Sequence, residues 1–155
     1  MNNMGEKPVL LHPSVAASIE GVHRKAPGTI SDLMEFQLVK EDREKGEYIL
    51  RCKTESWMRN VIGSLHGGIG ALIMDQAMGF VAYSYMTGPG TTPTVQMQLN
   101  YHRPLIPGED VLVRVRVISV SRTLVSMNTE AMLASDPETI CVTSSATFFK
   151  REDRK

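Results

Sequence analysis

The sequence predicts an α+β domain in which one antiparallel sheet wraps around a single long helix. Residues 65–86 are almost wholly apolar, and Asp75 is their only formally charged residue. A helix that is apolar nearly all round must be covered on most sides. Before and after this run, apolar and polar residues alternate in the pattern of half-buried antiparallel strands. We therefore expect two strands, the helix and then four strands, with the sheet curled around the helix.

The first half of the chain predicts a short helix, a hairpin and the long helix. Residues 13–24 fit a short helix weakly, among the prolines that punctuate the N-terminal segment. Strands are expected at 34–39 and 47–54, joined by a polar hairpin connection. The long helix is expected over 65–85, because Thr87-Gly88-Pro89-Gly90 follows and stops it.

The second half is expected to form strands throughout. The four predicted strands cover residues 95–101, 111–118, 125–133 and 139–149. The expected organisation is an N-terminal extension, partly irregular, over residues 1–30, one domain over 31–150, and a charged tail over 151–155.

Composition argues against several functional classes. Lys and Arg together number 17, as do Asp and Glu, so there is no electrostatic case for nucleic acid or an anionic membrane. The two cysteines lack motif spacing and no secretion signal is visible, which predicts a reduced, cytoplasmic protein. The apolar run is long enough to span a membrane, but its polar residues and glycines favour a buried core helix. No metal site is expected, because the histidines and cysteines show no ligand spacing.

Asp75 is the residue that most suggests chemistry. An ionised carboxylate inside an apolar helix costs several kcal/mol unless it is partnered or its pKa rises. A site that needs a general base or a carboxylate nucleophile would keep it, whereas a hydrogen-bonded structural acid is the alternative. Small residues share its stripe of the helix, three or four positions apart, and these are Gly68, Ala71, Gly79 and Ala82. We therefore expect Asp75 to lie in a narrow crevice.

Two segments resemble a known family. The run Asn60-Val61-Ile62-Gly63-Ser64-Leu65-His66-Gly67-Gly68, with an acid nine residues after the histidine, resembles the hotdog-fold thioesterases of the PaaI-like (phenylacetate-degradation) type. Residues 93–104, which end in Asn-Tyr-x-Arg-Pro, are similar to the strand that follows the helix in that family. The resemblance covers roughly residues 36–149, and His102 and Gln76 depart from the family pattern. It implies hydrolysis of acyl-CoA thioesters by an oligomer.

The glycine turn supplies the electrophilic end of such a site. The first N–H groups of a helix have no partner within it, and the helix dipole adds positive character there. Glycine at Gly67 and Gly68 lets a carbonyl oxygen reach those N–H groups without meeting a side chain. We expect the Gly67 N–H, assisted by Gly68, to polarise the thioester carbonyl. A tight loop-to-helix turn or close packing against the sheet is the alternative.

The resemblance assigns further roles around this turn. Asn60 matches the family's asparagine and would donate to the thioester or hold the attacking water, unless it only bonds its own loop. Thr94 matches a hydroxyl position facing the acid and would orient water, unless it simply fills the sheet face. His66 is expected to secure the turn at the substrate-binding end, with catalysis as the alternative. Arg103 and Arg122 are candidates for binding coenzyme A phosphates, and solvated turn arginines are the alternative.

The spacing of Gly67 and Asp75 requires a second chain. They are eight residues apart on one helix, and at about 1.5 Å per residue that is about 12 Å. A reacting carbonyl carbon cannot contact both groups at catalytic distance. The helix N-terminus of one chain must then meet the Asp75 of another, which predicts a homodimer with two equivalent sites. A homotetramer made of two such dimers is the expected assembly, although the spacing itself does not decide between dimer and tetramer.

The expected function is cofactor-free acyl-CoA hydrolysis, with coenzyme A as part of the substrate. Asp75 would activate water or act as the nucleophile, and the sequence does not separate these roles. A non-catalytic acyl-CoA-binding sensor is the alternative from another class. A hotdog enoyl-CoA hydratase is disfavoured by the nine-residue spacing of His66 and Asp75.

Overall fold

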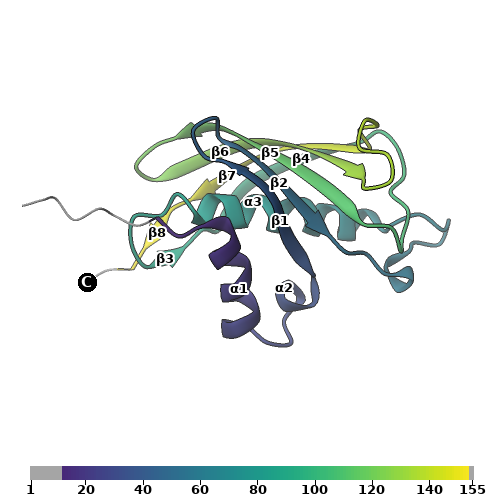
Figure 1. Cartoon of the computed structure of the whole chain (residues 1–155), viewed down its shortest axis with the longest axis horizontal. Helices are drawn as coiled ribbons and strands as arrows, with labels where there is room; N and C mark the ends of the chain where they lie inside the picture. Colours follow the sequence, from purple (N-terminus) through teal and green to yellow (C-terminus); the bar gives the residue numbers. More distant parts are fainter. Residues whose placement is uncertain (1–11, 154–155) are drawn as a thin grey trace, which may run out of the picture.

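The computed structural model describes residues 12–153, and the predicted sheet around one long helix is confirmed (Figure 1). Six antiparallel strands form the main sheet in the order β1-β2-β5-β6-β7-β4. Their bounds are β1 (Phe36–Asp42), β2 (Glu47–Cys52), β4 (Thr94–Tyr101), β5 (Val111–Val120), β6 (Leu124–Leu133) and β7 (Val142–Phe149). The long helix α3 (Gly67–Tyr83) packs against this sheet, and its Phe80 ring meets Phe36 of the edge strand β1 edge to face at 5.4 Å between centroids. The predicted α+β architecture is therefore confirmed.

The core lies between the inner face of the sheet and α3. Alternate residues of the central strands point inward and are fully buried, as the period-two pattern predicts. Examples are Val113 of β5, Met127 of β6 and Phe148 of β7. On α3, Ile73, Met74, Ala77 and Met78 complete this core.

The long helix is shorter than predicted at both ends. It begins at Gly67 instead of Leu65, because the Leu65 N–H donates to the Leu105 carbonyl and the His66 N–H donates to the Met58 carbonyl. These bonds hold residues 65–66 to neighbouring loops, and His66 has a non-helical ψ of 132° as the N-cap, so the helix begins after it. At the other end the helix stops at Tyr83, and the Ser84 hydroxyl donates back to the Val81 carbonyl.

The predicted last strand also starts late, at Val142 instead of Thr139. The backbone of Cys141 is occupied outside the ladder, since its N–H donates to the Ala131 carbonyl and its own carbonyl accepts from His102 and Arg103. The first strand runs over Phe36–Asp42 instead of 34–39, which shortens the hairpin connection.

Four short elements were not predicted from the sequence. They are α2 (Ile30–Leu33), the 3₁₀ turn η1 (Ser56–Met58), and the paired strands β3 (Gly90–Thr91) and β8 (Arg151–Glu152). Strand β8 lies in the segment expected to be a charged tail. Runs of two to four residues carry too little periodicity to be recognised in a sequence.

The expected N-terminal helix is present as α1 (Val15–Lys25). The Ser14 hydroxyl caps it by accepting from the Ala17 N–H at 3.0 Å. Val15 and Ile19 are buried on the side that packs against α3 and β1. Figure 1 shows α1 standing beside β1, next to the sheet that covers α3. The position of α1 becomes important at the candidate site.

Candidate active site

Asp75 is held by a hydroxyl from the sheet. It lies on the part of α3 that is half-buried, and the hydroxyl of Thr94 at the start of β4 donates to its Oδ1 at 2.6 Å. The carboxylate therefore has one fixed partner and remains partly accessible. It borders a cavity of about 610 Å³ that lies between α3, α1 and the segment 90–94. Asp75 is thus in a recess of the protein, as the small residues around it predicted.

A second cavity, of about 400 Å³, lies at the N-terminus of α3. Asn60, His66 and Gly67 line it together with Tyr101 and Arg103. The structure therefore brings together four of the predicted site residues here, while Asp75 and Thr94 lie at the other cavity. Arg122 lies exposed in the turn between β5 and β6, and neither of these two cavities includes it among the described residues.

The backbone N–H groups of the glycine turn differ in availability. His66 is the N-cap of α3, and its Nδ1 accepts from the Gly68 N–H at 2.9 Å. This bond occupies the Gly68 donor. The Gly67 N–H makes no hydrogen bond to any residue in the described range 12–153. Of the two predicted donors, Gly67 is thus the one left available for a carbonyl oxygen, and His66 secures the turn.

The Asn60 side chain makes three hydrogen bonds within its own turn. Its Oδ1 accepts from the N–H groups of Ile62 at 3.0 Å and Ser64 at 3.1 Å, and its Nδ2 donates to the Ser64 hydroxyl at 2.8 Å. Gly63 makes this turn with a φ of 89°, a conformation that favours glycine. Asn60 therefore shapes the loop that leads into α3. The amide Nδ2 carries two N–H groups and donates only one of them, to Ser64, within the described residues, so a donor toward a substrate remains.

Tyr101 is a site residue that the sequence analysis missed. Its hydroxyl donates to the Gly67 carbonyl at 2.5 Å, and its ring lies 3.4 Å from where a Cβ on Gly70 would be. Burial raises the pKa of Tyr101, which keeps the hydroxyl protonated as a donor. The tyrosine thus fixes the first turn of α3, and its ring lies against the helix at Gly70.

Comparison with known proteins identifies the class. The model of the thioesterase superfamily matches residues 62–140, which is just over half of the chain and includes α3, β4, Gly67 and Asp75. The chain belongs to this superfamily. The expected membership in a thioesterase family is therefore confirmed.

Particular relatives agree with this assignment. Human acyl-coenzyme A thioesterase 13 is 32% identical over 80 residues, which cover 51% of this chain and 56% of the relative. The match thus spans little more than half the length of that curated relative. A Streptococcus mutans protein crystallised with acetyl CoA superposes with a TM-score of 0.65 and 25% identity, covering 78% of this chain and 92% of that one.

A third relative confirms the hotdog fold. A putative thioesterase related to phenylacetic acid degradation, from Ralstonia eutropha JMP134, superposes with a TM-score of 0.71 at 16% identity. The superposition covers 85% of this chain and 98% of that protein. The fold predicted from the resemblance to PaaI-like thioesterases is thus the fold observed.

Two further observations concern metal binding and membrane-spanning helices. Among residues 12–153, no three His, Cys, Asp or Glu side chains gather closely enough to hold a metal ion. In the same part of the chain, no helix combines the length and apolar character needed to cross a membrane.

Proposed function

We propose that this protein hydrolyses acyl-CoA thioesters to the free acid and coenzyme A. The observation that carries the proposal is Asp75, the single carboxylate of an apolar helix, held by Thr94 at the mouth of a cavity large enough for an acyl group. A half-buried carboxylate with one oxygen fixed and access to a cavity is suited to taking a proton from water or to attacking the carbonyl itself. The superfamily membership supports this reaction type.

The electrophilic end of the proposed site is the free N–H of Gly67. It lies at the positive end of the α3 dipole, and a thioester oxygen that accepts from it would gain stabilisation as negative charge develops. In the hydrolysis, water adds to the carbonyl carbon while Asp75 takes its proton. The carbon–sulfur bond then breaks, and the coenzyme A thiolate leaves and takes up a proton.

We further propose that each site is shared between two copies of the chain. Asp75 and Gly67 border separate cavities of one chain, and the helix rise puts them about 12 Å apart. One thioester can use both groups only when the α3 N-terminus of one copy approaches the Asp75 of the other.

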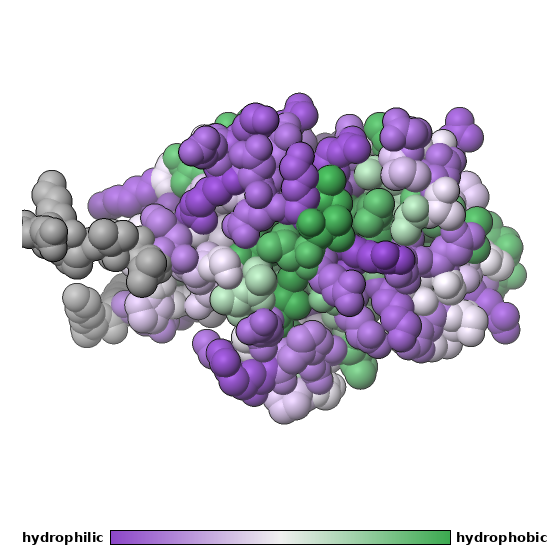
Figure 2. All heavy atoms as spheres, in the orientation of Figure 1, coloured by the Kyte–Doolittle hydropathy of each residue, from purple (hydrophilic) through white to green (hydrophobic). Residues whose placement is uncertain are grey.

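Unpaired apolar surface supports such a dimer. Strand β4 is an edge of the sheet, and its Val95 and Tyr101 are 60% and 54% exposed. An open edge carrying apolar side chains is normally covered. Val61 and Ile62, in the loop that precedes α3, are also almost fully exposed. Figure 2 shows apolar residues reaching the surface at the end of the molecule where this loop projects in Figure 1. A second copy of the chain would cover both the β4 edge and the loop that carries Val61 and Ile62.

Thiol release from a panel of acyl-CoAs tests the proposed function. We expect the purified protein to release coenzyme A from at least one aliphatic or aromatic acyl-CoA, detected with a thiol reagent. Binding of acyl-CoA with no turnover of any member would favour the sensing module instead. Hydration of an enoyl-CoA with no thiol release would favour the hydratase.

Removing the Thr94 hydroxyl is expected to slow hydrolysis while the fold is kept. Thr94→Val preserves the shape of the side chain but removes the donor to Asp75 Oδ1. A hydrogen bond to a charged group contributes about 1.5–3 kcal/mol. Because Thr94 is exposed to solvent, we expect a loss near the lower end of this energy range, which is about tenfold in kcat/KM. Thr94→Ser, which restores the hydroxyl, should recover activity, and an unchanged rate in Thr94→Val would remove Thr94 from the site.

A further inference from the structure

The cavity beside Asp75 has a wall that lies outside the segment matched by the superfamily. One side of the cavity is α3 from Leu72 to Tyr83, and the opposite side is α1, from Ala17 to Lys25. The superfamily match begins only at residue 62. The space next to the proposed catalytic carboxylate is therefore closed in part by α1, which lies outside the matched segment.

Both helices present a glycine to this cavity. Gly21 lies in the middle of α1 and Gly79 in the middle of α3. A Cβ added at Gly21 would meet nothing within 4 Å, and one added at Gly79 would make only an ordinary contact of 3.8 Å with Phe148. Neither glycine has a positive φ. Glycine is less stable than alanine inside a helix, so the packing of the chain does not account for these two residues, whereas a ligand that occupies the space does.

A buried acceptor in the same wall lacks a donor. Gln76 lines the cavity and is nine-tenths buried. Its Nε2 donates to the Ser31 carbonyl at 2.8 Å, but its Oε1 has no hydrogen-bond partner among the described residues. Buried acceptors are normally paired. This oxygen is closed off from the cavity, so Gln76 contributes to the wall through its bond to Ser31, which ties α2 to α3.

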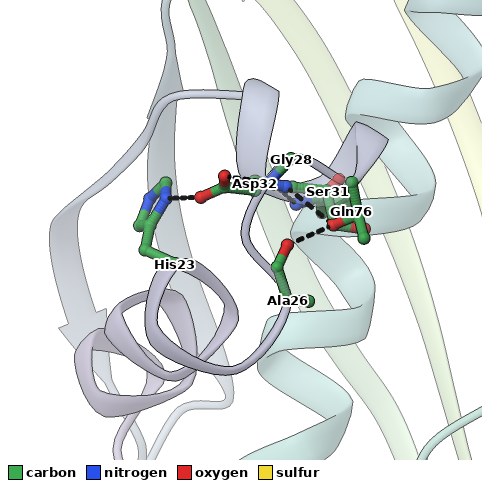
Figure 3. Close-up of polar contacts among 7 residues, drawn as sticks. His23, Ala26, Gly28, Ser31, Asp32 and Gln76 are labelled. Carbon is green, nitrogen blue, oxygen red and sulfur yellow. Dashed lines mark hydrogen bonds and ion pairs between the residues drawn. The ribbon is translucent and has the colours of Figure 1, made fainter.

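The α1 wall is held in place by polar contacts (Figure 3). His23 near the end of α1 contacts Asp32 of α2, with 2.7 Å between Nδ1 and Oδ1. The Gly28 N–H donates to the other Asp32 oxygen at 2.7 Å. The hydrogen bond from the Gly28 N–H is the main cause that lowers the pKa of Asp32, and the hydrogen bond with His23 lowers it further. Together with the bond from Gln76 to Ser31, they connect α1 and α2 to α3 beside Asp75.

We propose that this cavity receives the acyl group of the thioester, and that Gly21 of α1 sets the length of acyl chain that fits. The inference rests on the proposed function and names its substrate class. The walls beside Gly21 and Gly79 are apolar, with Val22, Leu72 and Phe80 among them. An extended aliphatic acyl group fits these apolar walls, with its carbonyl at Asp75 and its chain between α1 and α3.

Filling the space at Gly21 tests the proposal. The Gly21→Leu variant places an isobutyl group in the cavity, where the backbone leaves room for it. We expect the ratio of kcat/KM for palmitoyl-CoA to that for acetyl-CoA to fall about 10- to 200-fold, the range that small changes in an apolar pocket produce. Ala16→Leu is the matched control, because Ala16 is an exposed residue of the same helix outside the cavity lining. That control should keep the wild-type ratio.

The outcomes separate this proposal from the proposed function. If Gly21→Leu keeps both wild-type turnover and the wild-type ratio of kcat/KM for palmitoyl-CoA to that for acetyl-CoA, the proposed acyl pocket is wrong while acyl-CoA hydrolysis is unaffected. A wild-type protein that hydrolyses no acyl-CoA overturns both. The thermal unfolding midpoint of Gly21→Leu should be at or above that of the wild type, because leucine favours a helix more than glycine does. If Gly21→Leu does not fold, Gly21→Ala must shift the ratio in the same direction, and an unchanged ratio there overturns the pocket.

Discussion

The Asp75→Asn variant is expected to keep its fold and assembly and to lose most of its thioester hydrolysis. The amide has nearly the same shape as the carboxylate and can still accept from the Thr94 hydroxyl through its oxygen. It cannot take a proton from water or attack a carbonyl as a carboxylate does. Loss of a general base costs about 10²–10⁴-fold, and the loss should appear in kcat for every acyl-CoA that the wild type hydrolyses.

A matched control separates chemistry from stability. Asp110 is another half-buried carboxylate with a single strong side-chain partner, Arg51 at 2.6 Å, but it lies away from the cavity beside Asp75. Asp110→Asn should keep wild-type turnover. If Asp75→Asn also turns over near the wild-type rate, Asp75 is a structural acid and the proposed mechanism is wrong.

Mixing two inactive variants is expected to restore about a quarter of the wild-type activity. The variants are Asp75→Asn and Gly67→Val, combined under conditions that allow subunits to exchange. In a mixed dimer with shared sites, one site carries both lesions and the other carries neither. Random exchange makes about half of the dimers mixed, and each of these has one intact site of two. Thiol release measured before and after exchange gives the recovery.

The Gly67 lesion needs its own check, because the glycine contacts Tyr101. A Cβ at position 67 would lie 3.7 Å from the tyrosine ring, an ordinary contact, but the larger valine side chain presses further toward it. Gly67→Ala replaces Gly67→Val if the valine variant does not fold. Verified exchange without any recovery would show that the two groups serve the same chain or that one of them is not catalytic. A strictly monomeric protein in sedimentation would refute the shared site.

The parts of the fold that were predictable are those encoded in local patterns. The apolar run around Asp75 indicated the central helix, and alternation such as that of Val111, Val113 and Val115 indicated the buried faces of the strands. Glycine placement indicated the turn that enters the helix. Each of these signals lies within one segment of the sequence, so no knowledge of the partner segments was needed.

The features that were missed depend on residues far apart in the sequence. The start of α3 is decided by bonds from Leu65 to Leu105 and from His66 to Met58. Tyr101 contacts Gly67 from 34 positions away, and although it lies in the Asn-Tyr-x-Arg-Pro run, that run does not indicate this contact. The occupied Gly68 donor is a local exception, since it depends on the orientation of the His66 ring two positions away, which residue types alone do not give. The long-range contacts follow from tertiary packing, which periodicity does not encode.

The position of α1 also bears on how proteins of this kind diversify. The carboxylate, its threonine and the glycine turn all belong to the segment around α3 and β4, whereas the opposite wall of the cavity comes from the first helix of the chain. The two segments face each other across the cavity, and no hydrogen bond joins α1 to Asp75 within the described residues. Under the proposed function, natural variation in α1 would retune the range of accepted substrates while selection continues to preserve the reaction itself.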